Sequence, residues 1–305
     1  MYKVSDFDFL KNEIDFSYKK DFSFYAVAAS EDDYKEKMLF YLLDIKYLSF
    51  LEKHKDNIAG IICTKDIDKL INKTYKTIVT SEPKTLFFLI HNNLNDYEKV
   101  PTIIEEGCII SDKAYISPYN VVIKSGTVIE EFVSVKENVE IGQNCHIFAG
   151  CVIGSEGFNI FQLNGNNCLV KHRGRVIIGN NVNIMCNSCV DKGIYAHQYT
   201  KIEDNTFIDN LVQIAHDTKI KKNSEICAGV VTCGYVEVGE NVFMGVNSAV
   251  KQLLKVGNNS KIGMGAFVNK SVDNNTTMVG TLSYPIEKAK ILKSVDMMNI
   301  EKIQK

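Results

Sequence analysis

The stretch IDNLVQIAHDTKIKKNSEI, residues 208–226, decides the fold of this chain. Within it an isoleucine returns at every sixth position, and polar residues fill most of the places between. This period matches neither the 3.6-residue repeat of a helix nor the two-residue alternation of a strand. A repeat of fixed period indicates stacked, similar units. Six residues suit a β-helix in which each hexad forms one side of a three-sided coil and its aliphatic residue points inward.

The same period extends from this stretch in both directions. The positions that keep it carry aliphatic or small side chains: Ile110, Ile116, Ile123, Ile129, Val135, Ile141, Ile147, Ile153, Ile178, Ile184, Val190, Ala196, Ile202, Ile208, Ile214, Ile220, Ile226, Thr232, Val238, Met244, Val250, Val256, Ile262 and Val268. The series slips by one residue before Ile123 and breaks over the polar insertion GSEGFNIFQLNGNNCLVKHRGRV, residues 154–176. We therefore predict a β-helix over residues 103–280.

The two ends of the chain lack this period. Residues 1–102 alternate strand-like runs such as IAGIICTK (58–65) with helix-like runs such as KTLFFLIHNN (84–93), which predicts an α/β domain. We expect this domain to cap the first coil, because a solenoid needs closed ends. Residues 281–305 place apolar side chains at helical spacing, which predicts a C-terminal helix.

Composition excludes several classes of function. The net charge of −2 gives no electrostatic case for binding nucleic acid, and no apolar run is long enough to span a membrane. Nine cysteines without a CxxC pair suit a reducing, cytoplasmic setting. The six histidines form no closely spaced pair, so we predict no metal site, although a zinc-dependent hydratase stays open as another class.

His216 is the strongest candidate for chemistry. It stands two places after an inward isoleucine, so its imidazole is expected outside the core. A histidine titrates near neutral pH and can accept a proton from an attacking amine. We expect Asp191 or Asp209 to orient the ring, and Asn210 and Gln213 to contact substrate. A plain surface histidine, or one that only orients the amine, remains an alternative.

Cations form the second set of candidates. The chain has only two arginines, Arg173 and Arg175, both inside the insertion. A planar guanidinium suits phosphate or carboxylate, so both are predicted to bind substrate, and a structural clamp is the alternative. Lys251 and Lys261 are candidates for the phosphates of coenzyme A, although plain solvated lysines explain them equally.

Several segments carry a resemblance to a known family. GCVIGSEGF (150–158), GRVIIGNNVNI (174–184), CVDKGIY (189–195) and IDNLVQIAHDTKI (208–220) resemble the LpxD family of UDP-3-O-acylglucosamine N-acyltransferases. The resemblance implies a homotrimer of left-handed parallel β-helices that moves an acyl group from a thioester to the amine of a nucleotide-linked amino sugar. It implies His216 as general base, with no metal or redox cofactor. By position, Tyr41 and Tyr47 would stack on the pyrimidine in a nucleotide-binding N-terminal domain.

The sequence also departs from that family. Leu253 stands where the family has a second histidine, and Asp44 stands where it has an asparagine. We therefore expect a relative of the branch that acts on dTDP-4-amino-4,6-dideoxy sugars, such as dTDP-anthrose N-acyltransferase. Its donor would be a short 3-hydroxyacyl- or acetyl-CoA and its product would serve surface glycans. The alternatives are the lipid A enzyme with an acyl carrier protein as donor, and a non-catalytic trimer that binds nucleotide sugars.

Overall fold

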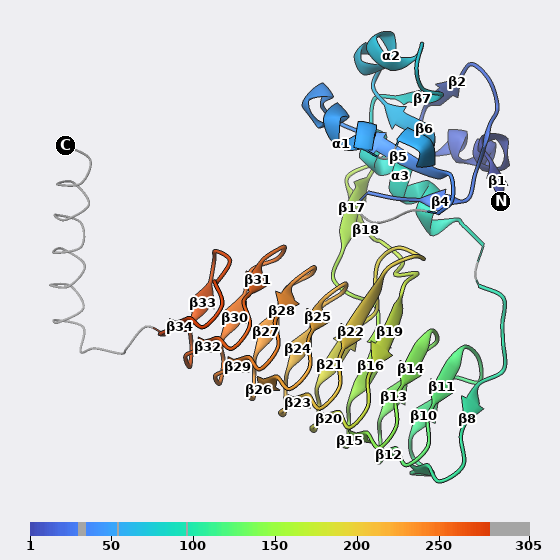
Figure 1. Cartoon of the computed structure of the whole chain (residues 1–305). Coiled ribbons are helices and arrows are strands. Elements are labelled where there is room, and N and C mark those ends of the chain that lie inside the picture. Colours follow the sequence, from blue (N-terminus) through green and yellow to red (C-terminus); the bar gives the residue numbers. More distant parts are fainter. Residues whose placement is uncertain (30–34, 54, 96, 281–305) are drawn as a thin grey trace, which may run out of the picture.

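A computed structural model describes residues 1–29, 35–53, 55–95 and 97–280 of the chain. It consists of a small α/β domain and a long parallel β-helix, the solenoid (Figure 1). The predicted fold class, a mainly β protein with an N-terminal α/β domain, is confirmed. The predicted C-terminal helix, 281–305, lies outside the described residues. No described helix is long and apolar enough to span a membrane.

The N-terminal domain is built around a five-stranded sheet of order β2-β7-β6-β5-β4, in which only β2 runs antiparallel to its neighbour. Its elements are β1 (Tyr2–Lys3), the 3-10 helix η1 (Val4–Asn12), β2 (Phe16–Tyr18), β3 (Ser23–Phe24), β4 (Ala26–Val27), β5 (Met38–Leu42), η2 (Ile45–Tyr47), α1 (Leu48–Lys53), η3 (Lys55–Asn57), β6 (Ile58–Cys63), α2 (Lys65–Ile71), β7 (Thr77–Thr80) and α3 (Pro83–Asn92). The strand predicted in IAGIICTK and the helix predicted in KTLFFLIHNN correspond to β6 and α3.

The solenoid has three flat faces, each a parallel sheet. Face 1 contains β8 (Ile103–Ile104), β11 (Val121–Ile123), β14 (Val139–Ile141), β19 (Arg175–Ile178), β22 (Tyr199–Ile202), β25 (Lys219–Ile220), β28 (Glu237–Val238) and β31 (Lys255–Val256). Face 2 contains β9 (Ile109–Ile110), β12 (Val128–Ile129), β15 (His146–Ile147), β20 (Asn183–Ile184), β23 (Phe207–Ile208), β26 (Glu225–Ile226), β29 (Phe243–Met244), β32 (Lys261–Ile262) and β34 (Thr277–Met278). Face 3 contains β10 (Tyr115–Ile116), β13 (Ser134–Val135), β16 (Val152–Ser155), β21 (Cys189–Asp191), β24 (Gln213–Ile214), β27 (Val231–Thr232), β30 (Ala249–Val250) and β33 (Phe267–Val268).

The hexad residues stack as the period predicts. From Ile123 onward they are buried in one continuous core, and equivalent residues pair in register between successive coils, as Ile202 does with Ile220. Ala196 is the exception, because it lies in a loop between β21 and β22 and not in a strand. The corners need backbone with positive φ, which asparagine tolerates well. At one corner asparagines from Asn181 to Asn275 also form a ladder of side-chain hydrogen bonds.

The insertion joins the two parts of the molecule. It forms a hairpin of β17 (Ile160–Leu163) and β18 (Asn166–Leu169) that rises from the solenoid to α3 (Figure 1). Phe161 stacks on Phe88 of α3 with ring centroids 5.7 Å apart. The expectation that the domain caps the first coil is therefore wrong: the domain lies over the middle coils, and Ile103 and Ile109 of the first coil are exposed.

Candidate active site

His216 lies at the corner between β24 and β25, where the chain turns from face 3 to face 1. The next residue, Asp217, has φ of 61°, the left-handed region. Equivalent corners in the first coils carry Asn120 and Asn138 with the same sign of φ. An aspartate also tolerates this region, so a carboxylate can be placed directly after the histidine without breaking the coil.

The His216 ring is held on three sides. Its Nδ1 lies 3.1 Å from Oδ2 of Asp217. Tyr235 contacts the ring edge to face, with centroids 5.4 Å apart. In the next coil the ring lies over Gly234, where an added Cβ would come within 2.3 Å of Cε1. Because only 14% of its side chain is exposed, the ring is a fixed group at the surface and not a freely moving one.

Asp217 is suited to support a charge on this ring. Its side chain is 3% exposed, and Oδ2 also accepts the Ile194 N–H at 3.1 Å. Oδ1 has no hydrogen-bond donor among the described residues. A carboxylate at Nδ1 favours the tautomer in which Nδ1 carries the proton and Nε2 has a free lone pair. The pair therefore leaves Nε2 able to accept a proton.

Neither predicted orienting carboxylate forms a hydrogen bond with His216 among the described residues. Asp209 accepts hydrogen bonds from the N–H and the side-chain amide of Asn210, both at 2.7 Å, and from the Ala228 N–H at 3.1 Å. Asp209 and Asn210 therefore stabilise a corner of the solenoid. The role of ring partner expected of Asp191 or Asp209 is thus corrected to Asp217, which sequence reasoning missed. A His–Asp pair at a corner that holds asparagine in the first coils is the signal that was available.

Asp191 nevertheless lies beside the ring. It is 5% exposed, and its carboxylate accepts Ser155 Oγ at 2.7 Å and Gln213 Nε2 at 2.8 Å. Burial raises the pKa of Asp191, and these two hydrogen bonds act against that rise. A Cβ added to Gly157 in the insertion would lie 3.3 Å from Oδ2 of Asp191 and 3.1 Å from Cδ2 of His216. Asp191 and Gln213 therefore belong to the same site as His216.

A second imidazole, His172, is buried next to the first. Its ring centroid lies 5.4 Å from that of His216, and none of its side chain is exposed. Glu156 accepts the His172 N–H at 2.6 Å and lies 3.1 Å from its Nδ1. Burial acts to raise the pKa of Glu156, but these contacts and the charge of Lys192 outweigh it and lower that pKa to about 2. Glu156 is therefore ionised beside His172 at neutral pH.

Arg173 is buried and bound to backbone carbonyls. Its guanidinium donates to four carbonyls at the end of α3 and just after it, those of His91 (2.9 Å), Asn92 (3.2 Å), Leu94 (2.6 Å) and Asn95 (3.0 Å). The last carbonyls of a helix lack partners within it. The guanidinium satisfies them and ties α3 to the solenoid. Of the two predicted roles, this geometry favours the structural clamp over substrate binding.

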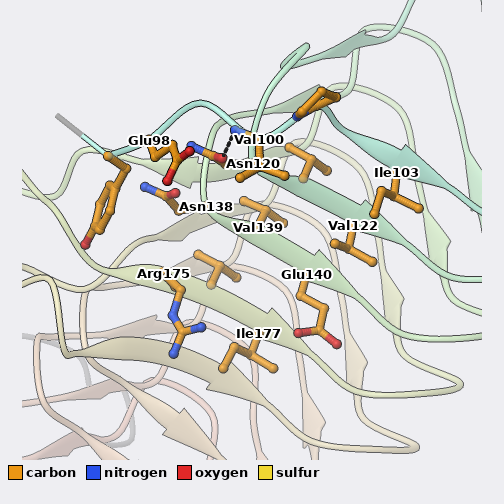
Figure 2. A pocket seen from close by; sticks show the side chains of 14 residues that line it. Glu98, Val100, Ile103, Asn120, Val122, Asn138, Val139, Glu140, Arg175 and Ile177 are labelled. Carbon is orange, nitrogen blue, oxygen red and sulfur yellow. Dashed lines mark hydrogen bonds between the residues drawn. The ribbon is translucent and has the colours of Figure 1, made fainter.

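Arg175 is exposed and lies apart from His216. It lines a pocket of about 330 Å³ on face 1, beneath the segment 97–103. Figure 2 shows Glu98 and Asn138 toward one side of this pocket and Ile103 toward the other. No residue in contact with His216 lines it. A role of Arg175 in the same site as His216 therefore has no support in the geometry.

The two tyrosines expected to bind a pyrimidine differ in exposure. Tyr41 packs on Phe87 with ring centroids 4.7 Å apart, and burial raises the pKa of its hydroxyl. Tyr47 is 55% exposed, with the Lys46 ammonium 5.0 Å from its ring centroid. Tyr47 is thus free to stack on a base, whereas Tyr41 serves in large part to pack the domain.

The remaining candidates lie on the last coils. Lys251 and Lys261 are exposed, and neither forms an ion pair within the described residues. Leu253 is 68% exposed at a corner with φ of 64°. No group of three or more histidine, cysteine, aspartate or glutamate side chains placed to hold a metal occurs in the part of the chain that the structure describes.

Comparison with known proteins agrees with the coils. Residues 199–234 match the family described as bacterial transferase hexapeptide (six repeats), and residues 235–270 match the hexapeptide repeat of succinyl-transferase. The UDP-3-O-acylglucosamine N-acyltransferase of Fusobacterium nucleatum is 33% identical over 221 residues, 64% of this chain and 65% of that protein. That of Wolinella succinogenes is 35% identical over 140 residues, 46% of this chain and 43% of that protein.

A solved structure supports the same fold. The UDP-N-acetylglucosamine acyltransferase of Francisella novicida superposes with a TM-score of 0.50 at 27% identity, over 59% of this chain and 65% of that one. The chain spans less than two thirds of the length of each of these three relatives. Residues 199–270 thus match hexapeptide repeats of transferases, and the chain is similar to enzymes named UDP-3-O-acylglucosamine N-acyltransferases.

Proposed function

We propose that this protein transfers an acyl group from a thioester to the amine of a nucleotide-linked amino sugar. The observation that carries the proposal is the His216–Asp217 pair, fixed at the solenoid surface over Gly234. It supplies a base whose Nδ1 is paired with a carboxylate and whose Nε2 is left to accept a proton. The similarity to N-acyltransferases points to the same chemistry.

In the proposed reaction the amine nitrogen attacks the thioester carbonyl, and a C–N bond forms. Nε2 of His216 takes the proton that this nitrogen loses, and Asp217 stabilises the resulting imidazolium. The C–S bond then breaks, and the departing thiolate receives the proton from Nε2. The histidine returns to its starting state, so the cycle needs no redox step.

The negatively charged oxygen formed during the attack needs a hydrogen-bond donor. The Gly234 N–H has no acceptor among the described residues, and a Cβ added to Gly234 would come within 2.6 Å of Nε2 of His216. A backbone N–H fixed at that position is a suitable oxyanion donor, because it need not reorganise during the reaction. We assign this role to Gly234.

The named relatives favour a UDP-linked acceptor. Their names specify UDP-3-O-acylglucosamine, whereas nothing in the comparisons supports the dTDP-4-amino sugar that we expected first. We therefore propose the lipid A type of reaction, N-acylation of a UDP-3-O-acylglucosamine. Tyr47 is the candidate for stacking on uracil. The exposed Lys251 and Lys261 are candidates for contact with an acyl carrier protein or coenzyme A.

We also propose that the protein works as a homotrimer. The outward-facing row of face 3 has no charged side chain: Tyr115, Ser134, Val152, Cys189, Gln213, Val231, Ala249 and Phe267. The outward row of face 1 carries five charges, for example Glu140 and Lys219. Interface cores are poor in charge, so face 3 is the better surface for packing against another copy. His216 would then border the cleft between copies.

Thermal unfolding with UDP, dTDP, coenzyme A and a 3-hydroxyacyl-CoA tests the substrate class, because a ligand that binds only the folded state raises the midpoint. We expect a rise with UDP. If dTDP raised the midpoint and UDP did not, a dTDP-linked amino sugar would be the better candidate for the acceptor. Turnover of an acyl thioester with UDP-3-O-acylglucosamine separates an enzyme from a binding trimer: ligand binding without any turnover would support the latter.

A further inference from the structure

Three polar side chains converge on Gly157. A Cβ at this position would come 3.1 Å from Nε2 of His172, 3.1 Å from Cδ2 of His216 and 3.3 Å from Oδ2 of Asp191. Two of the atoms, Nε2 and Oδ2, thus lie within hydrogen-bonding distance of one point beside the Gly157 Cα. The missing side chain at residue 157 is what allows them to approach.

One end of His172 is anchored and the other is not. The Gly157 N–H donates to Nδ1 at 3.1 Å, and Glu156 Oε2 accepts the His172 N–H and also lies 3.1 Å from Nδ1. When Nδ1 accepts from Gly157, the neutral ring carries its proton on Nε2; when Nδ1 donates to Glu156 instead, Nε2 carries a proton only in the imidazolium. Nε2 has no partner among the described residues, although the side chain is fully buried. An unpaired buried donor costs free energy, and such a group calls for a functional explanation.

An N–H at Nε2 of His172 would stabilise the negative charge of the Asp191 carboxylate. Its three hydrogen-bond donors, Ser155, Cys189 and Gln213, are neutral. A carboxylate buried with neutral donors alone resists ionisation. Lys192 is engaged elsewhere, at 3.0 Å from Glu156. Among the groups around Gly157, His172 is therefore the one able to favour the negative charge of Asp191.

We propose that His172, acting through Asp191, prepares the site to receive the positively charged amine of the acceptor. An amino sugar carries an ammonium group at neutral pH, and a negative Asp191 attracts it to the edge of His216. The ammonium then gives one proton to the solvent and attacks as a free amine. His172 is a positioning residue in this scheme. The inference rests on the proposed function, since it assumes an amine acceptor.

A purely structural role of His172, as an anchor for the insertion, is separable by two variants. In His172→Asn the amide replaces Nδ1, so the hydrogen bond from Gly157 can persist while Nε2 is lost. In His172→Gln the amide reaches the place of Nε2. The proposal requires Gln to preserve function better than Asn. An anchoring role requires the opposite order.

The test measures binding of UDP-glucosamine and UDP-glucose by calorimetry at pH 7. We expect the wild type to prefer the amine by ~10-fold or more, the size of one hydrogen bond to a charged group. His172→Asn and Asp191→Asn should each reduce the preference to about 2-fold, and the double variant should lose no more. His172→Gln should keep most of it. His146→Asn, which removes a carboxylate-paired histidine on face 2, is the matched control and should keep all of it.

A full preference in His172→Asn, or equal losses in the Asn and Gln variants, would overturn the proposal. Binding by the wild type without any preference for the amine would overturn it as well, while leaving acyl transfer to be measured separately. Conversely, a clear amine preference with no acyl transfer from any thioester would contradict the proposed function and leave the role of His172 standing.

Discussion

Gly234→Ala is the substitution that probes the active site most sharply. The new Cβ would lie 2.3 Å from Cε1, 2.6 Å from Nε2 and 3.0 Å from Nδ1 of His216. The backbone at residue 234 does not have positive φ, so alanine causes no strain of its own. The entire effect should therefore come from pushing the imidazole. The ring cannot move freely, because Tyr235 and Gly157 lie against it.

The size of the effect follows from these contacts. Carbon atoms pack at about 3.5–4.0 Å, so the ring must shift by about 1 Å. A misplacement of that size costs catalysis on the order of 10²-fold, or about 2.7 kcal/mol in the transition state. Overpacking should cost the fold about 1–3 kcal/mol. Replacement of a glycine returns about 0.4–1 kcal/mol through the unfolded chain.

The assay is acyl transfer at saturating and limiting acceptor, with thermal unfolding alongside. We expect kcat/KM to fall about 10²-fold and the midpoint to fall by a few degrees. The control is the same substitution in a His216→Ala background, where the clash is gone and Gly234→Ala should cost no stability. Near-wild-type transfer by Gly234→Ala, or equal destabilisation in both backgrounds, would refute this description of the site.

Three further outcomes are expected. Asp217→Asn should fold normally but lose about 10²-fold in kcat, because an amide cannot stabilise the His216 imidazolium; a loss confined to KM would contradict this. Arg173→Ala should lower the free energy of unfolding by about 3 kcal/mol, because the carbonyls at the end of α3 lose their hydrogen-bond donor. Arg175→Ala should change it little. Similar unfolding midpoints for the two variants would count against the role of Arg173 as a clamp. Burial lowers the pKa of His91 to about 4 from its ordinary 6.5. The unfolded chain then binds the proton first as pH falls, so stability should drop by about 3 kcal/mol between pH 6.5 and 4, and His91→Gln should flatten that part of the stability curve.

The solenoid was predictable because its constraint repeats. Each hexad must place one small or aliphatic side chain in a narrow core. Residues such as Ile202 and Ile220 therefore recur at a fixed interval in the sequence. The position of the N-terminal domain was not predictable. It depends on contacts such as Phe161 with Phe88, which occur once and leave no periodic signal.

The site was predictable only in part. His216 stood out because an imidazole interrupts a repeat that has no structural need of it. Arg173 was conspicuous for its rarity, but backbone carbonyls at the end of a helix carry no sequence signature, so its true partners were hidden. The roles of Gly234 and Gly157 were not predictable either. A glycine is required at these positions only because of the side chains that pack against it, and the sequence does not show those contacts.

The most direct test of the account is acyl transfer to UDP-3-O-acylglucosamine by the wild type and by His216→Asn. Asparagine keeps a polar group near the amine but cannot take its proton. The account predicts turnover by the wild type and a loss of about 10²–10⁴-fold in the variant, with the fold unchanged. A loss of only a few-fold would contradict the assignment of His216 as the base, and no turnover by the wild type with either a carrier-protein or a coenzyme A donor would contradict the proposed reaction itself.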